Sequence, residues 1–437
     1  MSASGAQELR GKRLNFVKHI YDSVHGYVGI TEIERSIIDT SIFQRLRRIK
    51  QLGLSDFVYP GATHSRFAHS VGSMFVMDKI ANRLIEDKFL KEDCLQELRL
   101  AALLHDIGHY PFSHLIENVM RKLHRDQGKH EMLSSHVIKN TEIGERIRDA
   151  GYDPEEICAI IGKRHMIKLF NYLLSSDFDV DRIDYLIRDA HHTGVAYGFI
   201  DVDRLIRTIT MNRKTSAQLA ILQKGRQAIE NFLIGRYHMY QSVYYHKTTV
   251  AFELMMERIY EALLKEGYNG APDLDAIRKF EESDLARYDD FSVWHQMETY
   301  QGKSDFLKES IKMLSERKPI KVAYQEPSLA MAKEKSSVWS VLLMPPQREL
   351  LSKDSGVEEE WIFISEPPPV ELVISGEPET AIYVEKDGDY SLLVEDDTSI
   401  AHHLKDFRYL TPRIYTKEEY VEKLKKTLRK CFGLGSS

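Results

Sequence analysis

Residues 103–114 of this chain read LLHDIGHYPFSH, and this stretch decides which fold the sequence can adopt. The residues from Glu97 to Leu104 are strong helix formers, and Gly108 and Pro111 then end the helix. Core packing does not require three histidines and an aspartate at the end of a buried helix. Charged groups that are buried there need a partner. Taken alone, a His-Asp pair is also typical of a capped helix, so a metal site needs ligands from other segments.

Two other segments offer such ligands. His69 lies in the first turns of a helix predicted from Arg66 to Leu84. Residues 177–189 place five aspartates between apolar residues, which is more than an amphipathic helix needs unless some of them face a cation. Imidazole nitrogens together with hard carboxylate oxygens suit Fe, Mn, Mg or Zn. The sequence therefore predicts a divalent metal of one of these kinds.

The order of these residues resembles the H…HD…D pattern of the HD-domain metal-dependent phosphohydrolases. Four blocks narrow the resemblance to the HD-domain deoxynucleoside triphosphate triphosphohydrolases, with their spacing kept over roughly residues 16 to 250. These blocks are DSVHG at 22–26, FQRLRRIKQLG at 43–53, PGATHSRFAHS at 60–70 and HYPFSH at 109–114. The resemblance implies that His69, His105, Asp106 and Asp181 bind the metal.

The implied reaction frees a deoxynucleoside and intact inorganic triphosphate. It expels the 5′ oxygen of the sugar, which is a poor leaving group unless an acid protonates it. The resemblance gives this role to His114, and it places His109 and His130 beside the reacting phosphate. Glu117 stands where the family usually has aspartate, and we expect it to orient His130. Individually, each of these histidines also fits a hydrogen-bonded structural role.

A triphosphate needs fixed cations, preferably guanidinium groups. Arg66 and Arg182 fit this need, although relatives often carry lysine at the position of Arg182. For Arg66 the alternative is an ion pair with a nearby aspartate.

Selectivity for deoxyribose needs a wall at the 2′ carbon and polar groups at the 3′ hydroxyl. The resemblance gives the wall to Tyr185 and the hydroxyl partners to Gln51 and Asp189. Leu52 also matches a sugar-site position, and Tyr244 is a further neighbour of the sugar or base. Tyr185 and Leu52 equally fit ordinary core positions.

A second group of matches predicts regulation by a guanine nucleotide, GTP or dGTP. Asp39, Gln44 and Arg47 resemble the guanine-reading residues of the family's activator site, and Lys18 adds phosphate charge there. An activator held between subunits couples its binding to assembly, so we expect a homotetramer.

A second activator pocket has weaker support in the sequence. Leu222 stands where relatives with two pockets carry an arginine, and Tyr240 replaces a family histidine. The residues that still support such a pocket are Arg207, Lys224 and Lys247. The number of activator sites therefore stays open.

Composition sets further bounds. Of the 437 residues 43% are hydrophobic, which supports a full core, and the formal net charge of -6 indicates no polybasic surface for nucleic acid. No run approaches the length of a membrane span, and Cys94, Cys158 and Cys431 show no metal-ligand spacing. We expect a cytoplasmic protein without membrane or specific nucleic-acid partners.

The fold class predicted is mainly α, with an all-helical HD-domain core over residues 1–315 and a small mixed α/β region over residues 316–437. Strand-like stretches are predicted at 319–324, 338–344, 361–364 and in a hairpin at 381–394, followed by a charged helix at 417–431. The hairpin has Asp387-Gly388 at its turn. No catalytic constellation falls in this second region.

Two other classes of function stay open. One is an HD-domain phosphohydrolase that uses the same metal ligands on nucleoside monophosphates or cyclic nucleotides. The other is a nucleotide sensor that keeps the pocket for recognition alone; His114 and His130 argue against it, because pure binding needs no general acid.

Overall fold

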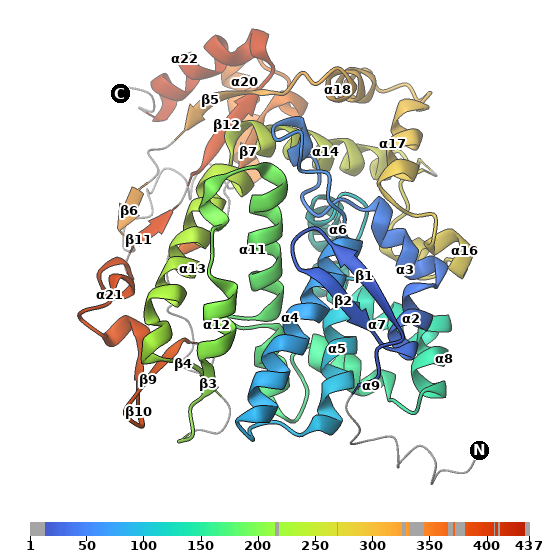
Figure 1. Cartoon of the computed structure of the whole chain (residues 1–437). Coiled ribbons are helices and arrows are strands. Elements are labelled where there is room, and N and C mark those ends of the chain that lie inside the picture. Colours follow the sequence, from blue (N-terminus) through green and yellow to red (C-terminus); the bar gives the residue numbers. More distant parts are fainter. Residues whose placement is uncertain are drawn as a thin grey trace.

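The computed structural model confirms the predicted fold class, a mainly α protein with a small sheet-containing C-terminal part (Figure 1). It describes residues 14–214, 218–268, 270–325, 329–331, 345–365, 370–371, 381–405, 407–409 and 411–432. The α-helices are α2 (Glu32–Ile38), α3 (Ser41–Arg45), α4 (Arg66–Glu86), α5 (Leu95–Leu104), α6 (His114–His124), α7 (His130–Asn140), α8 (Glu142–Asp149), α9 (Pro154–Ile161), α10 (Lys168–Leu174), α11 (Val180–Thr193), α12 (Val202–Thr208), α13 (Arg226–Met239), α14 (Lys247–Lys265), α15 (Leu274–Ile277), α16 (Glu282–Leu285), α17 (Asp290–Glu298), α18 (Asp305–Ser315), α20 (Pro345–Ser355), α21 (Ile400–Leu404) and α22 (Val421–Phe432).

Three of these helices position the predicted metal ligands. The long helix α4 packs against both α5 and α11 through a fully buried face. Gly72 on α4 makes the contact with α11 possible, since a Cβ at this position would lie 2.0 Å from the Asp184 carboxylate. Helix α11 begins at an N-cap, where Asp179 accepts a hydrogen bond from the backbone N–H of Arg182, and it ends at Gly194 with φ 76°.

Short strands accompany the helices. They are β1 (Lys18–Asp22), β2 (Gly26–Ile30), β3 (Ile209–Met211), β4 (Leu219–Leu222), β5 (Lys321–Gln325), β6 (Leu329–Met331), β7 (Phe363–Ser365), β8 (Val370–Glu371), β9 (Tyr383–Lys386), β10 (Asp389–Leu392), β11 (Phe407–Tyr409) and β12 (Arg413–Thr416). The sequence does not predict β1–β2, an antiparallel hairpin that packs against α4, or the pair β3–β4. Most strand-like stretches of the C-terminal region correspond to observed elements.

The predicted hairpin at the end of the chain is β9–β10. Its turn residues Asp387 and Gly388 both have positive φ, 53° and 85°, as a two-residue hairpin turn requires. The predicted strands at 319–324 and 361–364 correspond to β5 and β7, and the predicted C-terminal helix to α22. The predicted strand at 338–344 lies outside the described residues.

The C-terminal strands belong to three sheets, one of which is β6–β11–β8 (Figure 1). The β5–β12–β7 sheet lies near α14 and α22, whereas β9 joins β4 in parallel and so extends a sheet that begins at β3. Two further hydrogen bonds cross position 315: Arg413 to the carbonyl of Tyr245 at 2.9 Å, and the Tyr415 hydroxyl to the carbonyl of Lys247 at 3.1 Å. The domain boundary at 315/316 stays a prediction. The backbone pairing of β4 with β9 crosses this position.

Among the described helices, none is both long and apolar enough to span a bilayer.

Candidate metal centre and active site

The four predicted metal ligands converge at the meeting point of α4, α5 and α11. Nε2 of His69 lies 2.9 Å from Asp181 Oδ1 and 3.7 Å from Asp106 Oδ2, and Nε2 of His105 lies 3.3 Å from Asp106 Oδ1 and 3.6 Å from Asp181 Oδ1. The ligand atoms of His69, His105 and Asp106 lie within 4.8 Å of one another, and all three residues are buried.

Hydrogen bonds on the far side of each ring aim the imidazoles inward. His69 Nδ1 donates to Asp184 Oδ2 at 2.8 Å, and His105 Nδ1 donates to the Ala102 carbonyl at 2.8 Å. Both Nε2 atoms are buried and make no hydrogen bond. Two inward-facing imidazole nitrogens beside two carboxylates are the kinds of ligand that suit a divalent metal, so the donor set fits such an ion.

A network of buried charged residues lies on the side of His69 that faces away from the other predicted ligands. The sequence did not predict a role for these residues. Asp184 accepts hydrogen bonds from Arg188 at 2.9 and 3.0 Å and contacts His25 Nε2 at 2.6 Å. Arg188 also donates to both carboxylate oxygens of Asp22. The spacing of Asp181 and Asp184 on α11 was an available signal, because residues three apart lie on one helical face.

The carboxylates dominate the electrostatics of this cluster. Burial alone lowers the pKa of His69, but the carboxylates of Asp181 and Asp184 outweigh it and raise that pKa to about 10. Burial likewise raises the pKa of Asp106, yet the positive groups His105 and Arg66 hold it well below its usual range. The centre therefore gathers negative charge that a cation would neutralise.

The three predicted catalytic histidines form a second cluster beside the first. The rings of His109 and His130 stack with centroids 3.8 Å apart, and His109 Nε2 lies 3.3 Å from the metal ligand Asp106. Glu117 Oε2 accepts from His114 Nδ1 at 2.8 Å and from His130 Nδ1 at 3.1 Å. One carboxylate thus orients two histidines, whereas the sequence predicted this only for His130.

The Glu117 carboxylate also sets the charge of this cluster. Burial lowers the pKa of His130, but Glu117 more than compensates and raises it. The carboxylate beside His109 is Asp106, but burial and the positive charges of Arg66 and His130 outweigh it and lower the pKa of His109 well below the usual value. Because His114 and His130 each begin a helix, the partial positive charge of that helix end adds to the attraction for an anion.

The loop between these histidines is strained and needs support. Phe112 and Ser113 have φ of 53° and 56°, which non-glycine residues rarely adopt. Asp290, at the start of α17, accepts hydrogen bonds from the N–H of Phe112 at 2.6 Å and of Lys50 at 2.9 Å. Buried Arg45 donates to the carbonyls of Ile107, His109 and Tyr288. No local pattern marks Asp290, since its partners lie 178 and 240 residues away in sequence.

The predicted phosphate-binding arginines are both engaged within the protein. Arg66 is buried, donates to Ser113 Oγ at 2.7 Å and pairs with Asp106, which is the alternative left open by the sequence. Arg182 pairs with Asp179 on its own helix and donates to the Ser176 carbonyl. These contacts use Nε and Nη1 of Arg66 and Nη1 of Arg182.

One cavity of about 320 Å³ brings the predicted substrate residues together. Tyr244 donates to Asp189 at 2.7 Å, and the same carboxylate contacts His64 at 2.7 Å; Tyr185 packs edge-on against Tyr244. The cavity is lined by Gln51, Leu52, Gly53, Ser55, Arg66, Phe112, Ser113, His114, Leu115, Asn118, Tyr185, Asp189, Tyr240, Tyr244, Glu253 and Glu257. Of the predicted substrate residues, Arg182 is the one outside this lining.

The predicted activator residues lie at the surface on and around α2 and α3. Gln44 accepts from Arg47 Nε at 2.7 Å, and the Arg47 guanidinium covers the Phe67 ring at 3.6 Å. Asp39 is exposed and lies 3.8 Å from Arg35. Lys18 is exposed at the start of β1.

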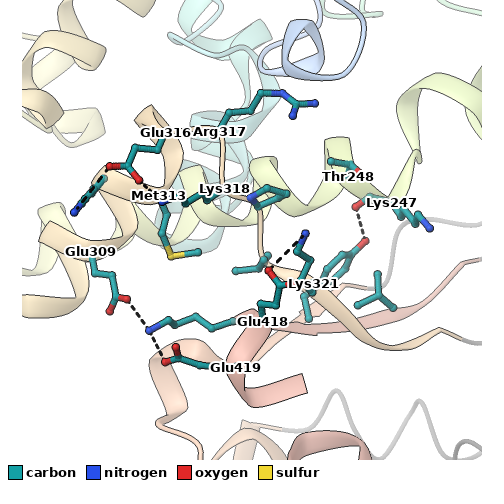
Figure 2. A pocket seen from close by; sticks show the side chains of 16 residues that line it. Lys247, Thr248, Glu309, Met313, Glu316, Arg317, Lys318, Lys321, Glu418 and Glu419 are labelled. Atoms are coloured by element: carbon teal, nitrogen blue, oxygen red, sulfur yellow. Dashed lines mark hydrogen bonds and ion pairs between the residues drawn. The ribbon is translucent and has the colours of Figure 1, made fainter. Parts of the chain in front are cut away.

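The residues considered for a second activator pocket do not share one cavity in the described part of the chain. Arg207 lines a cavity of about 980 Å³ between α11 and α12, and Lys247 lines another of about 940 Å³ between α14, α18 and β5. Lys224 lines neither. In the second cavity charges are paired internally: Nζ of Lys417 lies 2.6 Å from Glu309 and 2.8 Å from Glu419. Figure 2 labels both glutamates and marks the two ion pairs with dashed lines.

Comparison with known proteins agrees with this geometry. A buried His-Asp centre on packed helices defines a metal-dependent phosphohydrolase. The HD domain matches residues 66–189, which include all four predicted metal ligands, and the HD associated region matches residues 200–437. The chain belongs to the HD-domain family that carries this HD associated region.

Three relatives illustrate the likeness. An uncharacterized protein of Methanocaldococcus jannaschii is 38% identical over 278 residues, 63% of this chain and 54% of that protein. Deoxynucleoside triphosphate triphosphohydrolase SAMHD1 of Mus musculus is 32% identical over 234 residues, 46% of this chain and 35% of SAMHD1. A crystal structure of a hypothetical protein from Aquifex aeolicus superposes with a TM-score of 0.75 at 29% identity, over 94% of this chain and 99% of that one. The chain thus spans about half or less of the two curated relatives.

Proposed function

We propose that this protein hydrolyses deoxynucleoside triphosphates to a deoxynucleoside and inorganic triphosphate. The observation that carries the proposal is the 320 Å³ cavity, which unites Gln51, Tyr185, Asp189 and Tyr244 with Arg66 and His114. Arg66 contacts a metal ligand, so the cavity adjoins the metal centre. The similarity to mouse SAMHD1, whose name states this activity, supports the same reading.

The chain supplies groups for each requirement of this reaction. A divalent metal held by His69, His105, Asp106 and Asp181 would polarise a phosphoryl oxygen and acidify water. Water adds to the α-phosphorus while the bond from phosphorus to the 5′ oxygen breaks, so that oxygen must receive a proton. His114 is exposed at the mouth of the cavity, and because Glu117 holds its Nδ1, its Nε2 faces outward as the proton donor.

The neighbouring groups favour phosphate over other anions. The Glu117 carboxylate raises the pKa of His130 and so favours its positively charged form, and the ring stacks on His109. Arg66 adds a guanidinium group at the boundary between the cavity and the metal centre. Together they place positive charge on the side of the cavity that adjoins the metal.

We extend the proposal to regulation and assembly. Asp39, Gln44, Arg47 and Lys18 lie at the surface, where a guanine nucleotide, GTP or dGTP, would reach them from a neighbouring subunit. The expected working form is a homotetramer, because an activator shared between subunits links its binding to assembly. Light scattering with and without GTP tests this part: a mass that GTP does not change would contradict it.

The reaction is tested by incubating the purified chain with each deoxynucleoside triphosphate and Mg or Mn, with and without GTP. Chromatography should show a deoxynucleoside and intact triphosphate in equal amounts. The double variant His105→Ala/Asp106→Ala, which removes two metal ligands, is the blank. Release of phosphate from nucleoside monophosphates or cyclic nucleotides, with deoxynucleoside triphosphates untouched, would instead identify the other HD phosphohydrolase activity. No turnover of any of these would leave a nucleotide sensor.

A further inference from the structure

His64 is a buried residue that contacts both predicted partners of the sugar's 3′ hydroxyl, although it has no task in the proposed function. Its side chain is 1% exposed and does not line the cavity of about 320 Å³. Nε2 of His64 lies 2.7 Å from Asp189 Oδ1, and the backbone carbonyl of His64 accepts a hydrogen bond from the N–H of Gln51 at 3.0 Å. One residue outside the cavity thus contacts two residues of its lining.

Few groups hold the Asp189 carboxylate in place. Oδ1 faces the His64 ring and Oδ2 accepts from the Tyr244 hydroxyl at 2.7 Å, and within the described part of the chain no other side chain hydrogen-bonds to this carboxylate. Because a carboxylate only accepts hydrogen bonds, Nε2 of His64 carries the proton and donates it. A carboxylate offers about four lone-pair positions, so capacity for a donor from a ligand in the cavity remains.

Gln51 adds a second unsatisfied group to the same cavity. Its side-chain oxygen is buried and has no hydrogen-bond partner among the described residues. The backbone around Gln51 is paired with the segment that carries His64, since Lys50 and Ser65 form an antiparallel bridge. His64 therefore sets the position of Gln51 through the backbone and that of Asp189 through the imidazole ring.

Packing alone does not explain a histidine at this position. The His64 ring stacks on His192 with centroids 4.5 Å apart and planes 13° apart, a contact that phenylalanine would make equally well. Nδ1 of His64 is buried and has no hydrogen-bond partner among the described residues, which costs free energy that phenylalanine would avoid. What the imidazole adds is the hydrogen bond from Nε2 to Asp189.

We infer that His64 is a positioning residue that fixes Asp189 and Gln51 around the 3′ hydroxyl and so makes the protein select substrates that carry this hydroxyl. The inference rests on the proposed function, in which Gln51 and Asp189 contact the sugar. A group that binds substrate must be held to within about 0.5 Å and 10–20°. With His64 in place Asp189 keeps one orientation, and a substrate without the hydroxyl leaves Asp189 and Gln51 unpaired. Without His64 the carboxylate keeps only the bond from Tyr244 and turns more freely.

The test compares two substrates that differ only in the 3′ hydroxyl. With the full chain, metal and GTP, kcat/KM is measured for the deoxynucleoside triphosphate that the native protein hydrolyses fastest and for its 2′,3′-dideoxy counterpart. The native protein should prefer the substrate with the hydroxyl about tenfold or more, the usual effect of leaving buried polar groups unpaired. In His64→Leu this preference should fall about threefold or more, because two losses that act through the same group are not additive.

Two further variants separate positioning from packing. Glutamine has an amide N–H as many bonds from Cβ as Nε2 of histidine, so His64→Gln should keep the native preference. His192→Phe keeps a ring against His64 and removes no hydrogen bond to Asp189, so it should keep the preference as well. The ratio of two substrates does not depend on the fraction of folded protein, so a partly unfolded variant does not mimic the effect.

Every outcome decides whether the inference holds. A preference unchanged in His64→Leu would show that His64 only packs, and a larger preference would show that releasing Asp189 strengthens its bond to the hydroxyl. Either result, an equal fall in His64→Gln or His192→Phe, or a native protein that hydrolyses both substrates equally well, would overturn the inference and leave the proposed function intact. A native protein that hydrolyses no deoxynucleoside triphosphate would overturn the proposed function and the inference with it.

Discussion

Asp290 Oδ1 accepts a hydrogen bond from the backbone N–H of Phe112 at 2.6 Å, across 178 residues of sequence. Its other oxygen holds the N–H of Lys50, which precedes Gln51 in the substrate cavity. The start of α17 thereby joins the strained histidine loop to the segment that carries Gln51. Residues of the HD associated region thus shape a candidate site whose predicted metal ligands all lie in the HD domain.

Asp290→Asn should lower kcat about tenfold or more while the metal content stays unchanged, because an amide has only one acceptor and turns an N–H donor toward the other backbone N–H. We also expect a loss of about 1–3 kcal/mol in the free energy of unfolding, the usual effect of an unsatisfied buried donor. Steady-state kinetics, metal analysis and urea unfolding check this. Asp284→Asn, an exposed change on α16, is the control, and equal effects in both variants would contradict the prediction.

Glu117→Gln should reduce kcat about 10- to 100-fold, the usual result of removing a carboxylate that orients functional histidines. The amide keeps one accepting oxygen but loses the negative charge that His114 and His130 share, and the pKa of His130 falls because the carboxylate that raised it is gone. NMR titration of the histidine ring protons measures that pKa. Glu131→Gln is the matched control, since Glu131 Oε2 lies 3.6 Å from the same His130 nitrogen but makes no hydrogen bond with it. A His130 pKa that is unchanged in Glu117→Gln would refute this reading.

Metal removal should destabilise the protein. Chelation leaves the negative charge of Asp106 and Asp181 without its cation, and metal at 100 times its Kd contributes about 2.7 kcal/mol to folding. Thermal unfolding with chelator and with Mn or Mg should therefore give clearly different Tm values. The His105→Ala/Asp106→Ala variant should show the same Tm in both conditions, and a metal-dependent Tm in that variant would place the bound metal elsewhere.

The stability of the native protein should fall as pH rises from about 5 to 8, in part because of Glu253. Its pKa is about 8 in the folded protein against an ordinary value of 4.5, so between these values the folded state binds more protons than the unfolded state. The Glu253→Gln side chain does not titrate, so the free energy of unfolding of this variant relative to the native protein should rise by about 1–3 kcal/mol over that pH range. The estimate takes about 1.4 kcal/mol for each pKa unit and is reduced for partial exposure of Glu253 to solvent. Urea unfolding at pH 5.5 and 8.5 measures the difference. A parallel pH dependence in both proteins would show that Glu253 ionises normally.

The sequence predicts the features that are local. The helix ending in His105-Asp106 and the hairpin around Asp387-Gly388 follow from helix propensity and turn chemistry, and both are present. The hairpin of β1 and β2 went unpredicted because its strands are only five residues long and packing against α4 supports them.

Within the candidate site, residue types and their order place the metal ligands and the histidine cluster together. What the sequence does not show is how these groups are supported. The sequence does not distinguish Asp184 from the other four aspartates of residues 177–189, because it does not show which face of α11 packs against Gly72. Asp290 lies 240 residues from Lys50. Such support depends on tertiary contacts, which no periodicity records.

The pairing of β9 with β4 and the bond from Arg413 to Tyr245 also affect how the chain folds during synthesis. Tyr245 leaves the ribosome 168 residues before its partner. At about 5–20 residues per second, the wait is roughly 10–30 s. During that interval the edge of β4 stays unpaired, and a free strand edge is a template for association with other chains. The nascent chain is thus exposed to misassembly after its predicted metal ligands have all emerged and before its last strands arrive.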